Sequence, residues 1–139
     1  MTTLVFPGQG SQFLGMSKDF YENFDSAREI FKKVEHSTNI NIKDIIFKNR
    51  DNLLDITKFT QLSIFTASMA KFVVFKELFG KTNLFKNINY VLGHSLGEYS
   101  ALVASNVISY EKCSKLLKLR GELMQDAYPE NQSGMAAVL

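Results

Sequence analysis

The chain has 139 residues, 45% of them hydrophobic and 22% charged, which are the proportions of one globular domain with a buried core. Its 16 basic and 14 acidic residues leave a net charge of +2, too small to indicate nucleic-acid binding. It has no basic leader, no apolar run long enough to span a bilayer and only one cysteine, Cys113, so a cytoplasmic protein with neither a membrane nor a nucleic-acid partner is expected.

The first part of the chain predicts one strand and two helices. Residues 3–6, "TLVF", are apolar and partly β-branched and run into "PGQG", which predicts a buried strand entering a tight loop. Ser26 and Glu29 have capping-box spacing at the start of the helical segment "DSAREIFKKVEH". The apolar stripe of this helix is Ile30, Phe31 and Val34. The segment "NIKDIIFKN" predicts a second, short helix.

The rest of the chain continues this alternation. Residues 60–79 are apolar on nearly every turn and are followed by Gly80, which predicts a central helix with a glycine at its end. "INYVL" predicts a second buried strand, and helices follow over "GEYSALVASNV" and "SYEKCSKLLKLRGELMQDAY". "GMAAVL", residues 134–139, predicts one more strand. This order predicts the α/β class, with a parallel sheet covered by helices.

A serine stands between two glycines where the second strand turns into a helix. The stretch Gly93-His94-Ser95-Leu96-Gly97 fits the G-x-S-x-G pattern of a nucleophile elbow, in the expected context of a strand before and a helix after. The glycines leave room for the sharp turn, which aims the Leu96 N–H and the positive helix end at an oxyanion beside the serine. A tight crossing that merely needs small residues is the alternative, but the context favours a nucleophile.

One face of the last helix carries an arginine among apolar residues. That face consists of Cys113, Leu116, Leu117, Arg120, Leu123, Met124 and Ala127. A guanidinium stays charged in proteins, so it needs a carboxylate or a comparable partner, and a structural ion pair or an arginine reaching the surface would each satisfy it. Beside a candidate nucleophile, a clamp for a substrate carboxylate is the better explanation. Ser95 is therefore predicted to attack an acyl group whose far end is negative.

Three stretches together resemble a known family. "FPGQGSQ" at 6–12, "GHSLGEYSAL" at 93–102 and "RGELMQ" at 120–125 are similar to motifs of the malonyl-CoA:acyl carrier protein transacylases and of the acyltransferase domains of fatty-acid and polyketide synthases. The resemblance implies an α/β-hydrolase-like large lobe. It also implies transfer of malonyl from malonyl-CoA to the phosphopantetheine thiol of acyl carrier protein, through a malonyl-serine, in fatty-acid biosynthesis. Malonyl-CoA and acyl carrier protein are the implied partners, and neither a metal nor another cofactor is implied.

The resemblance also implies roles for single residues. Ser95 is the implied nucleophile, and Arg120 the residue that grips the malonyl carboxylate. The backbone N–H groups of Gln9 and Leu96 are the implied oxyanion hole; without the other two motifs, "PGQG" would be an ordinary β-turn. Gln61 matches the glutamine of a T-Q-P motif in the family, whose proline is Leu62 here, and this change is interpreted as local to a helix start.

The sequence does not supply an evident base for Ser95. His94 adjoins the serine, so the tight turn should direct it away, and His36 fits a site at the C-terminal end of the first long helix. In the family, the catalytic histidine lies well downstream, beyond a ferredoxin-like subdomain, and members are much longer. The resemblance thus implies that residues 1–128 form the N-terminal part of the large lobe and that 129–139 start the truncated small subdomain. The chain is then expected to be a fragment, a truncated gene product or one piece of a split protein, and a missing C-terminal half is among the expected partners.

Two other functions remain open at this point. A serine hydrolase of the α/β-hydrolase or patatin type also uses G-x-S-x-G, although Arg120 and "PGQG" argue against it. A non-catalytic remnant, or a scaffold that binds a second polypeptide, fits the absent base and the unpaired last strand. A hydrolase would pass the acyl group to water without a carrier thiol, whereas a remnant would self-associate without turnover.

Overall fold

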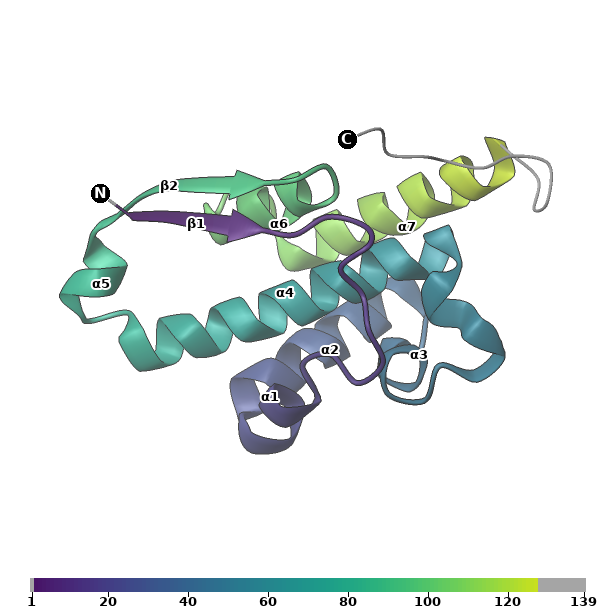
Figure 1. Ribbon diagram of the computed structural model, residues 1–139, viewed down its shortest axis with the longest axis horizontal. Helices are drawn as coiled ribbons and strands as arrows, with labels where there is room; N and C mark the ends of the chain where they lie inside the picture. The colour runs from purple at the N-terminus through teal and green to yellow at the C-terminus, as the bar shows by residue number, and fades with distance from the viewer. Residues whose placement is uncertain (1, 128–139) are drawn as a thin grey trace.

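The computed structural model describes residues 2–127, which form a small parallel sheet and a set of helices (Figure 1). The elements in chain order are β1 (Thr2–Phe6), α1 (Lys18–Asn23), α2 (Asp25–Thr38), α3 (Ile42–Lys48), the 3₁₀ helix η1 (Arg50–Asp55), α4 (Thr57–Phe79), α5 (Asn83–Lys86), β2 (Ile88–Gly93), α6 (Gly97–Ala104) and α7 (Tyr110–Ala127). The two strands lie on one side of α4, and α1, α2 and α3 lie on the other. The strand expected over 134–139 and the boundary expected at residue 129 lie outside the described residues.

The sheet consists of β1 paired in parallel with β2, as the strand–helix order predicts. Phe6 pairs with Gly93, so the carboxyl ends of both strands reach the same edge and bring "PGQG" beside the elbow. The prediction that both strands are buried is wrong for one face of the sheet. Val5, Tyr90 and Leu92 alternate along that face and are 62%, 55% and 54% exposed, because no described element covers it.

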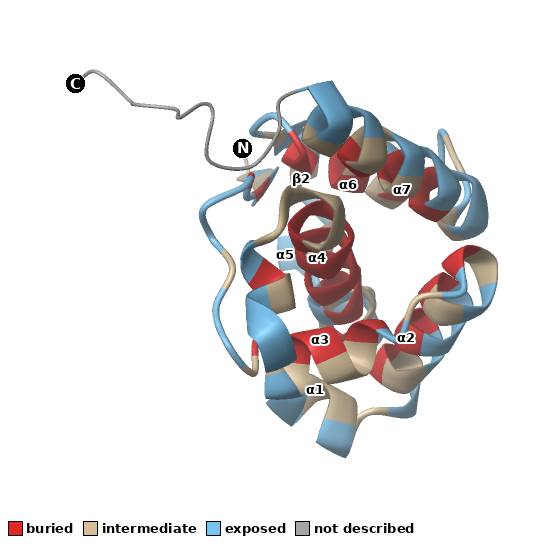
Figure 2. Cartoon of the chain, turned by 90° about the vertical axis from the view of Figure 1, so that its right-hand side faces the viewer, coloured by how far each residue is buried: buried red, intermediate tan, exposed pale blue. Residues whose placement is uncertain are grey.

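The core is built around α4, which Figure 2 shows as a largely buried helix surrounded by the others. From Thr60 to Ala70 every residue of α4 is buried, and the helix packs against α7, α2 and α3. A helix covered on all sides needs apolar residues on every turn, which is the pattern that predicts it. It begins at Thr57, so Leu62 lies inside the helix, fully buried, and the interpretation of Leu62 as a change at a helix start is wrong.

The predicted ends of two helices differ from the observed ends. α2 begins at Asp25 with Phe24 before it, and no side chain caps it; Ser26 instead donates its hydroxyl hydrogen bond to Glu77 of α4 at 2.6 Å. The capping-box prediction is therefore wrong, because a tertiary acceptor takes the hydroxyl. α4 does end before Gly80, but this glycine is right-handed, with φ −58°, rather than left-handed.

The buried face of α7 is narrower than the sequence predicts. Cys113, Ser114, Leu117 and Gly121 are buried, whereas Leu123 is 60% exposed. The predicted stripe fails toward the end of the helix because the described residues place no element over Leu116, Leu123 and Met124. Arg120 is half-buried at the border of this stripe.

Two buried hydroxyls in the helical core lack a hydrogen-bond partner among the described residues. They are the Oγ atoms of Ser63 on α4 and Ser100 on α6. Because an unpaired buried hydroxyl loses its bonds to water without replacement, we expect each Ser→Ala change to raise the free energy of unfolding by about 1 kcal/mol. Urea denaturation measures this. Ser114→Ala is the matched control, since the Ser114 hydroxyl donates to the Tyr110 carbonyl at 2.7 Å. If Ser114→Ala raised the free energy of unfolding as much as Ser63→Ala, the missing partner would not explain the effect.

Candidate active site

Ser95 occupies a strained turn between β2 and α6. Its φ of 51° lies in the left-handed region, which side chains other than glycine rarely adopt. The turn brings Gly93 onto the first residues of α6, so that a Cβ at Gly93 would lie 2.0 Å from the Gly97 carbonyl carbon. A Cβ at Gly97 would lie 2.3 Å from the Phe6 carbonyl oxygen. Both glycines are thus required by close backbone contacts, and the turn from β2 into α6 has the sharp backbone geometry that the G-x-S-x-G pattern predicts.

The elbow is attached directly to the end of β1. The His94 N–H donates to the Phe6 carbonyl at 3.1 Å, and the Gly97 N–H donates to the His94 carbonyl at 2.9 Å. Gly8 lies so close to His94 that a Cβ there would be 2.6 Å from both the carbonyl oxygen and the Nδ1 atom of His94. The "PGQG" loop and the elbow therefore support each other across the carboxyl edge of the sheet.

Several backbone N–H groups of the elbow and of the "PGQG" loop have no acceptor among residues 2–127. They include those of Leu96, which precedes α6, and of Gln9 in the loop after β1, together with those of Ser95 and Gly8. Neighbouring groups of the loop are paired: the Gly10 N–H donates to the Gln12 side chain at 2.9 Å, and Ser11 donates its hydroxyl to the Gly8 carbonyl at 2.7 Å. Unpaired N–H groups at a helix start are suited to bind a developing oxyanion.

Arg120 extends from α7 to two neighbours that carry no charge. Its Nη1 donates to Gln61 Oε1 on α4, and its guanidinium lies 5.6 Å from the centre of the Tyr99 ring on α6. Tyr99 follows Ser95 by about one helical turn, so the guanidinium is anchored to the helix that starts at the elbow. No carboxylate lies within ion-pair distance of Arg120 in the described part of the chain. The charge of this guanidinium is thus not neutralised by residues 2–127, as a clamp for a substrate carboxylate requires.

Gln61 also belongs to this site, although no sequence pattern by itself assigns it a role. It is fully buried in the second turn of α4, where its Oε1 accepts from Arg120 and its Nε2 lies 3.1 Å from Met124 Sδ. A buried amide on an otherwise apolar helix needs a hydrogen-bonding partner, and this was the signal available in the sequence. The pairing with Arg120 depends on how α4 and α7 cross, which no local pattern encodes.

No hydrogen bond joins the Ser95 hydroxyl to either histidine side chain among the described residues. The His94 imidazole lies beside Gly8, as the tight turn predicts, and His36 is exposed in the last turn of α2. These placements agree with structural roles for both.

Cys113 is buried against α6, with its Sγ 3.7 Å from the Tyr99 carbonyl. Burial raises the pKa of the Cys113 thiol to about 12, so almost no reactive thiolate exists near neutral pH. We expect a disulfide thiol reagent at pH 8 to label the unfolded chain fully and the folded chain very slowly. Because the unfolded thiol loses its proton first, stability should also fall as the pH rises above the ordinary thiol pKa. Equal labelling rates for folded and unfolded chains would contradict this burial.

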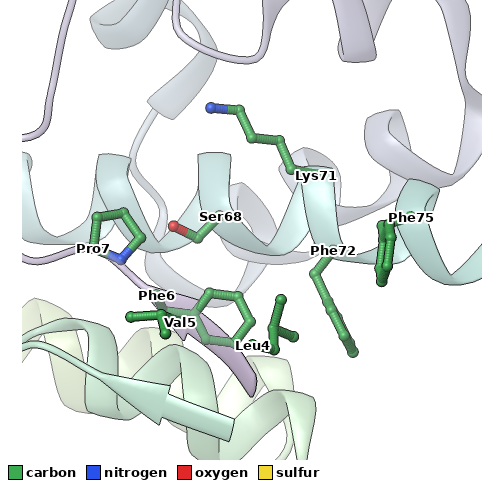
Figure 3. Close-up of a pocket in the computed structure, with 8 residues that line it drawn as sticks. All are labelled: Leu4, Val5, Phe6, Pro7, Ser68, Lys71, Phe72 and Phe75. Atoms are coloured by element: carbon green, nitrogen blue, oxygen red, sulfur yellow. The ribbon is translucent and has the colours of Figure 1, made fainter. Parts of the chain in front are cut away.

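One groove among the described residues is lined by neither Ser95 nor Arg120. It measures about 220 Å³ and lies between β1 and α4, where the Phe6 and Phe72 rings meet edge to face at 5.9 Å (Figure 3). Leu4 and Phe6 face Phe72 and Phe75, while the Lys71 amine points away from the strand. The lining of the groove is mostly apolar, with Ser68 and Lys71 as its polar members.

Residues 2–127 contain neither a metal-binding cluster nor a membrane-spanning helix. No group of three or more His, Cys, Asp and Glu side chains there is arranged to hold a metal ion. Among the described helices, none combines the length and the apolar character needed to cross a membrane.

Curated relatives share the sequence along nearly its whole length. The chain is 39% identical over 138 residues to a Staphylococcus aureus (strain MRSA252) protein named malonyl CoA-acyl carrier protein transacylase, covering 99% of this chain and 42% of the relative. A Bacillus subtilis protein of the same name is 38% identical over 134 residues, with 96% and 32% covered. The chain thus spans less than half the length of these relatives.

Solved structures show the same arrangement. Malonyl CoA-acyl carrier protein transacylase from Clostridium perfringens superposes with a TM-score of 0.82 at 38% identity, covering 93% of this chain and 39% of that one. Acyl-carrier-protein S-malonyltransferase from Bartonella henselae gives 0.84 at 39% identity, with 93% and 41% covered. The family model described as "Acyl transferase domain" matches residues 3–139. The chain belongs to the acyl transferase domain family.

Proposed function

We propose that this chain provides the nucleophile, the oxyanion donors and the carboxylate-binding residue of a malonyl-CoA:acyl carrier protein S-malonyltransferase of fatty-acid synthesis. The observation that carries the proposal is the left-handed turn at Ser95, which is followed by the unpaired N–H of Leu96 and held against the "PGQG" loop by the close contact of Gly8 with His94. The unneutralised guanidinium of Arg120 supports malonyl as the acyl group. The names of the relatives support the same activity, and a cytoplasmic location is part of the proposal.

The proposed reaction has two steps, and the malonyl group is transferred intact in each. In the first, Ser95 Oγ attacks the thioester carbonyl carbon, the C–S bond breaks, and coenzyme A leaves as a thiol with the proton that the serine gave up. In the second, the phosphopantetheine thiol attacks the malonyl ester, the C–O bond breaks, and the serine regains a proton. The Leu96 and Gln9 N–H groups would bind the oxyanion in both steps, and one such donor contributes roughly 3–4 kcal/mol.

The acceptor of the Ser95 proton is assigned to a group outside residues 2–127. The His94 imidazole lies beside Gly8, and His36 lies in the last turn of α2. A histidine of the downstream part of the family's fold, as the resemblance implies, is the source we assign. Acyl carrier protein is the assigned acceptor, since a solved relative with a TM-score of 0.82 is a type II polyketide-synthase carrier protein in complex with its malonyl-transacylase.

Intact-mass spectrometry after mixing the chain with malonyl-CoA tests the proposal. We expect a gain of one malonyl group on the wild type, supplied if necessary with the remaining part of a relative, and none on Ser95→Ala. Arg120→Ala should lose the malonyl adduct while accepting acetyl from acetyl-CoA. Release of malonate to water without transfer to a carrier thiol would instead support the serine hydrolase. No adduct in any combination would support the non-catalytic remnant.

A further inference from the structure

We infer that Gly121 is a positioning residue that sets the distance between Arg120 and Gln61, and with it the selectivity for acyl groups that end in a carboxylate. The inference rests on the proposed function, because it concerns the same substrate-binding group. Gly121 lies where α7 crosses the first turn of α4. A Cβ at Gly121 would lie 2.7 Å from the Lys58 Cα and 3.1 Å from the Lys58 carbonyl oxygen. Both atoms belong to the backbone, so no side-chain rotation could relieve the contact.

The two residues in this contact each adjoin a member of the carboxylate-binding pair. Gly121 directly follows Arg120, and Lys58 lies on the same face of α4 as Gln61, one turn earlier. The hydrogen bond from Arg120 to Gln61 therefore bridges the same helix crossing that Gly121 keeps narrow. Any side chain at 121 would push the helices apart at this point and lengthen that bond.

The hydrogen bond from Arg120 to Gln61 orients the guanidinium without neutralising its positive charge. Gln61 is fully buried and neutral, so it orients the guanidinium while leaving its positive charge available for an anion. The Tyr99 ring supports the guanidinium at 5.6 Å from another helix. Widening the crossing would leave the charge in place but free the guanidinium to rotate. Binding of a carboxylate should therefore weaken more than binding of a neutral acyl group.

The same turn of α4 also holds the "PGQG" loop. Gln9 Nε2 donates to Thr57 Oγ1 at 3.3 Å, and Thr57 is the first residue of α4. Since Lys58 comes next, the narrow crossing at Gly121 ties α7 to the turn that holds this loop. Gly121 thus sets the position of Arg120 relative to the oxyanion donor as well as to Gln61.

The test compares Gly121→Ala with Leu117→Ala, both in a Ser95→Ala background that binds thioesters without reacting. Leu117 is fully buried on the same helix, so its removal destabilises α7 without widening the crossing. The first measurement is the NMR signal of the Arg120 side chain, assigned with Arg120→Lys. We expect Gly121→Ala to shift it and to speed its hydrogen exchange, and Leu117→Ala to leave it unchanged. An unchanged signal in Gly121→Ala overturns the inference, whatever the ligand affinities.

The second measurement is calorimetric binding of malonyl-CoA and acetyl-CoA. We expect Gly121→Ala to weaken the binding of malonyl-CoA about tenfold and the binding of acetyl-CoA less than about twofold. Equal losses for both ligands would mean that Gly121 is only structural. If the parent protein itself does not prefer malonyl-CoA, the proposed function fails, and the NMR signal still decides whether Gly121 positions Arg120. If the Gly121→Ala protein does not fold, the same change is made in a protein that also carries Ser63→Ala and Ser100→Ala. Those two changes are expected to raise the free energy of unfolding.

Discussion

Gly93→Ala is expected to abolish the elbow and lower the free energy of unfolding by about 3 kcal/mol or more. The added Cβ would lie 2.0 Å from the Gly97 carbonyl carbon and 2.1 Å from the Glu98 nitrogen, so α6 would have to move away from the end of β2. Overpacking against side chains costs about 1–3 kcal/mol, and backbone atoms yield less. Thermal and urea denaturation measure the loss, and intact-mass spectrometry measures the loss of Ser95 acylation.

Gly10→Ala is the matched control for this prediction. Gly10 has a left-handed φ of 102° and open space where a Cβ would be, so alanine there meets only a conformational cost of about 1 kcal/mol. A stability loss in Gly10→Ala as large as that in Gly93→Ala would show that loop strain, and not the contact with α6, dominates. Normal acylation by Gly93→Ala would refute the elbow geometry itself.

Gln61→Glu is expected to remove the preference for malonyl-CoA over acetyl-CoA. The change is nearly isosteric, but it puts a carboxylate where the neutral Oε1 now accepts from Arg120, and the resulting ion pair cancels the charge that a substrate carboxylate needs. A hydrogen bond to a charged group is worth about 1.5–3 kcal/mol, so malonyl-CoA affinity should fall roughly 10- to 150-fold. Calorimetric titration of the Ser95→Ala protein with both thioesters measures the ratio.

The Gln61→Leu variant distinguishes the effect of the Arg120 charge from the effect of the orientation of its guanidinium. It leaves the guanidinium positive but without its acceptor, so a reduced preference for malonyl-CoA should persist. Arg120→Ala should match Gln61→Glu in selectivity. If Gln61→Glu keeps the wild-type preference, the charge of Arg120 does not select the substrate.

The parts of the site that depend on neighbouring residues in sequence could be predicted. The elbow follows from Gly93 and Gly97 around Ser95, because the same few residues create the steric requirement and the turn that satisfies it. The parallel pairing of β1 and β2 follows from the order of strands and helices. The central position of α4 follows from its apolar residues on every turn. The roles assigned to Ser95, Arg120, Gln9 and Leu96 stay predictions.

What could not be predicted depends on contacts between distant elements. Ser26 has the spacing of a helix cap, but its hydroxyl finds Glu77 on another helix. Helical periodicity places Leu117 and Leu123 on one face of α7, yet only Leu117 is covered by described elements. The hydrogen bond between Arg120 and Gln61 joins residues far apart in sequence, and it exists only where Gly121 lets the helices approach.

The hydrogen bond between the elbow and the end of β1 also bears on the order in which the described residues fold. The His94 N–H donates to the carbonyl of Phe6, so the turn at Ser95 is held by a strand that lies far from it in the sequence. Contacts of such long sequence separation form late, because the intervening loop must close first. The contacts of α2 and α3 with α4 join segments that are closer in sequence, so they can form earlier. We therefore expect the left-handed turn at Ser95 to form only after these helices have packed.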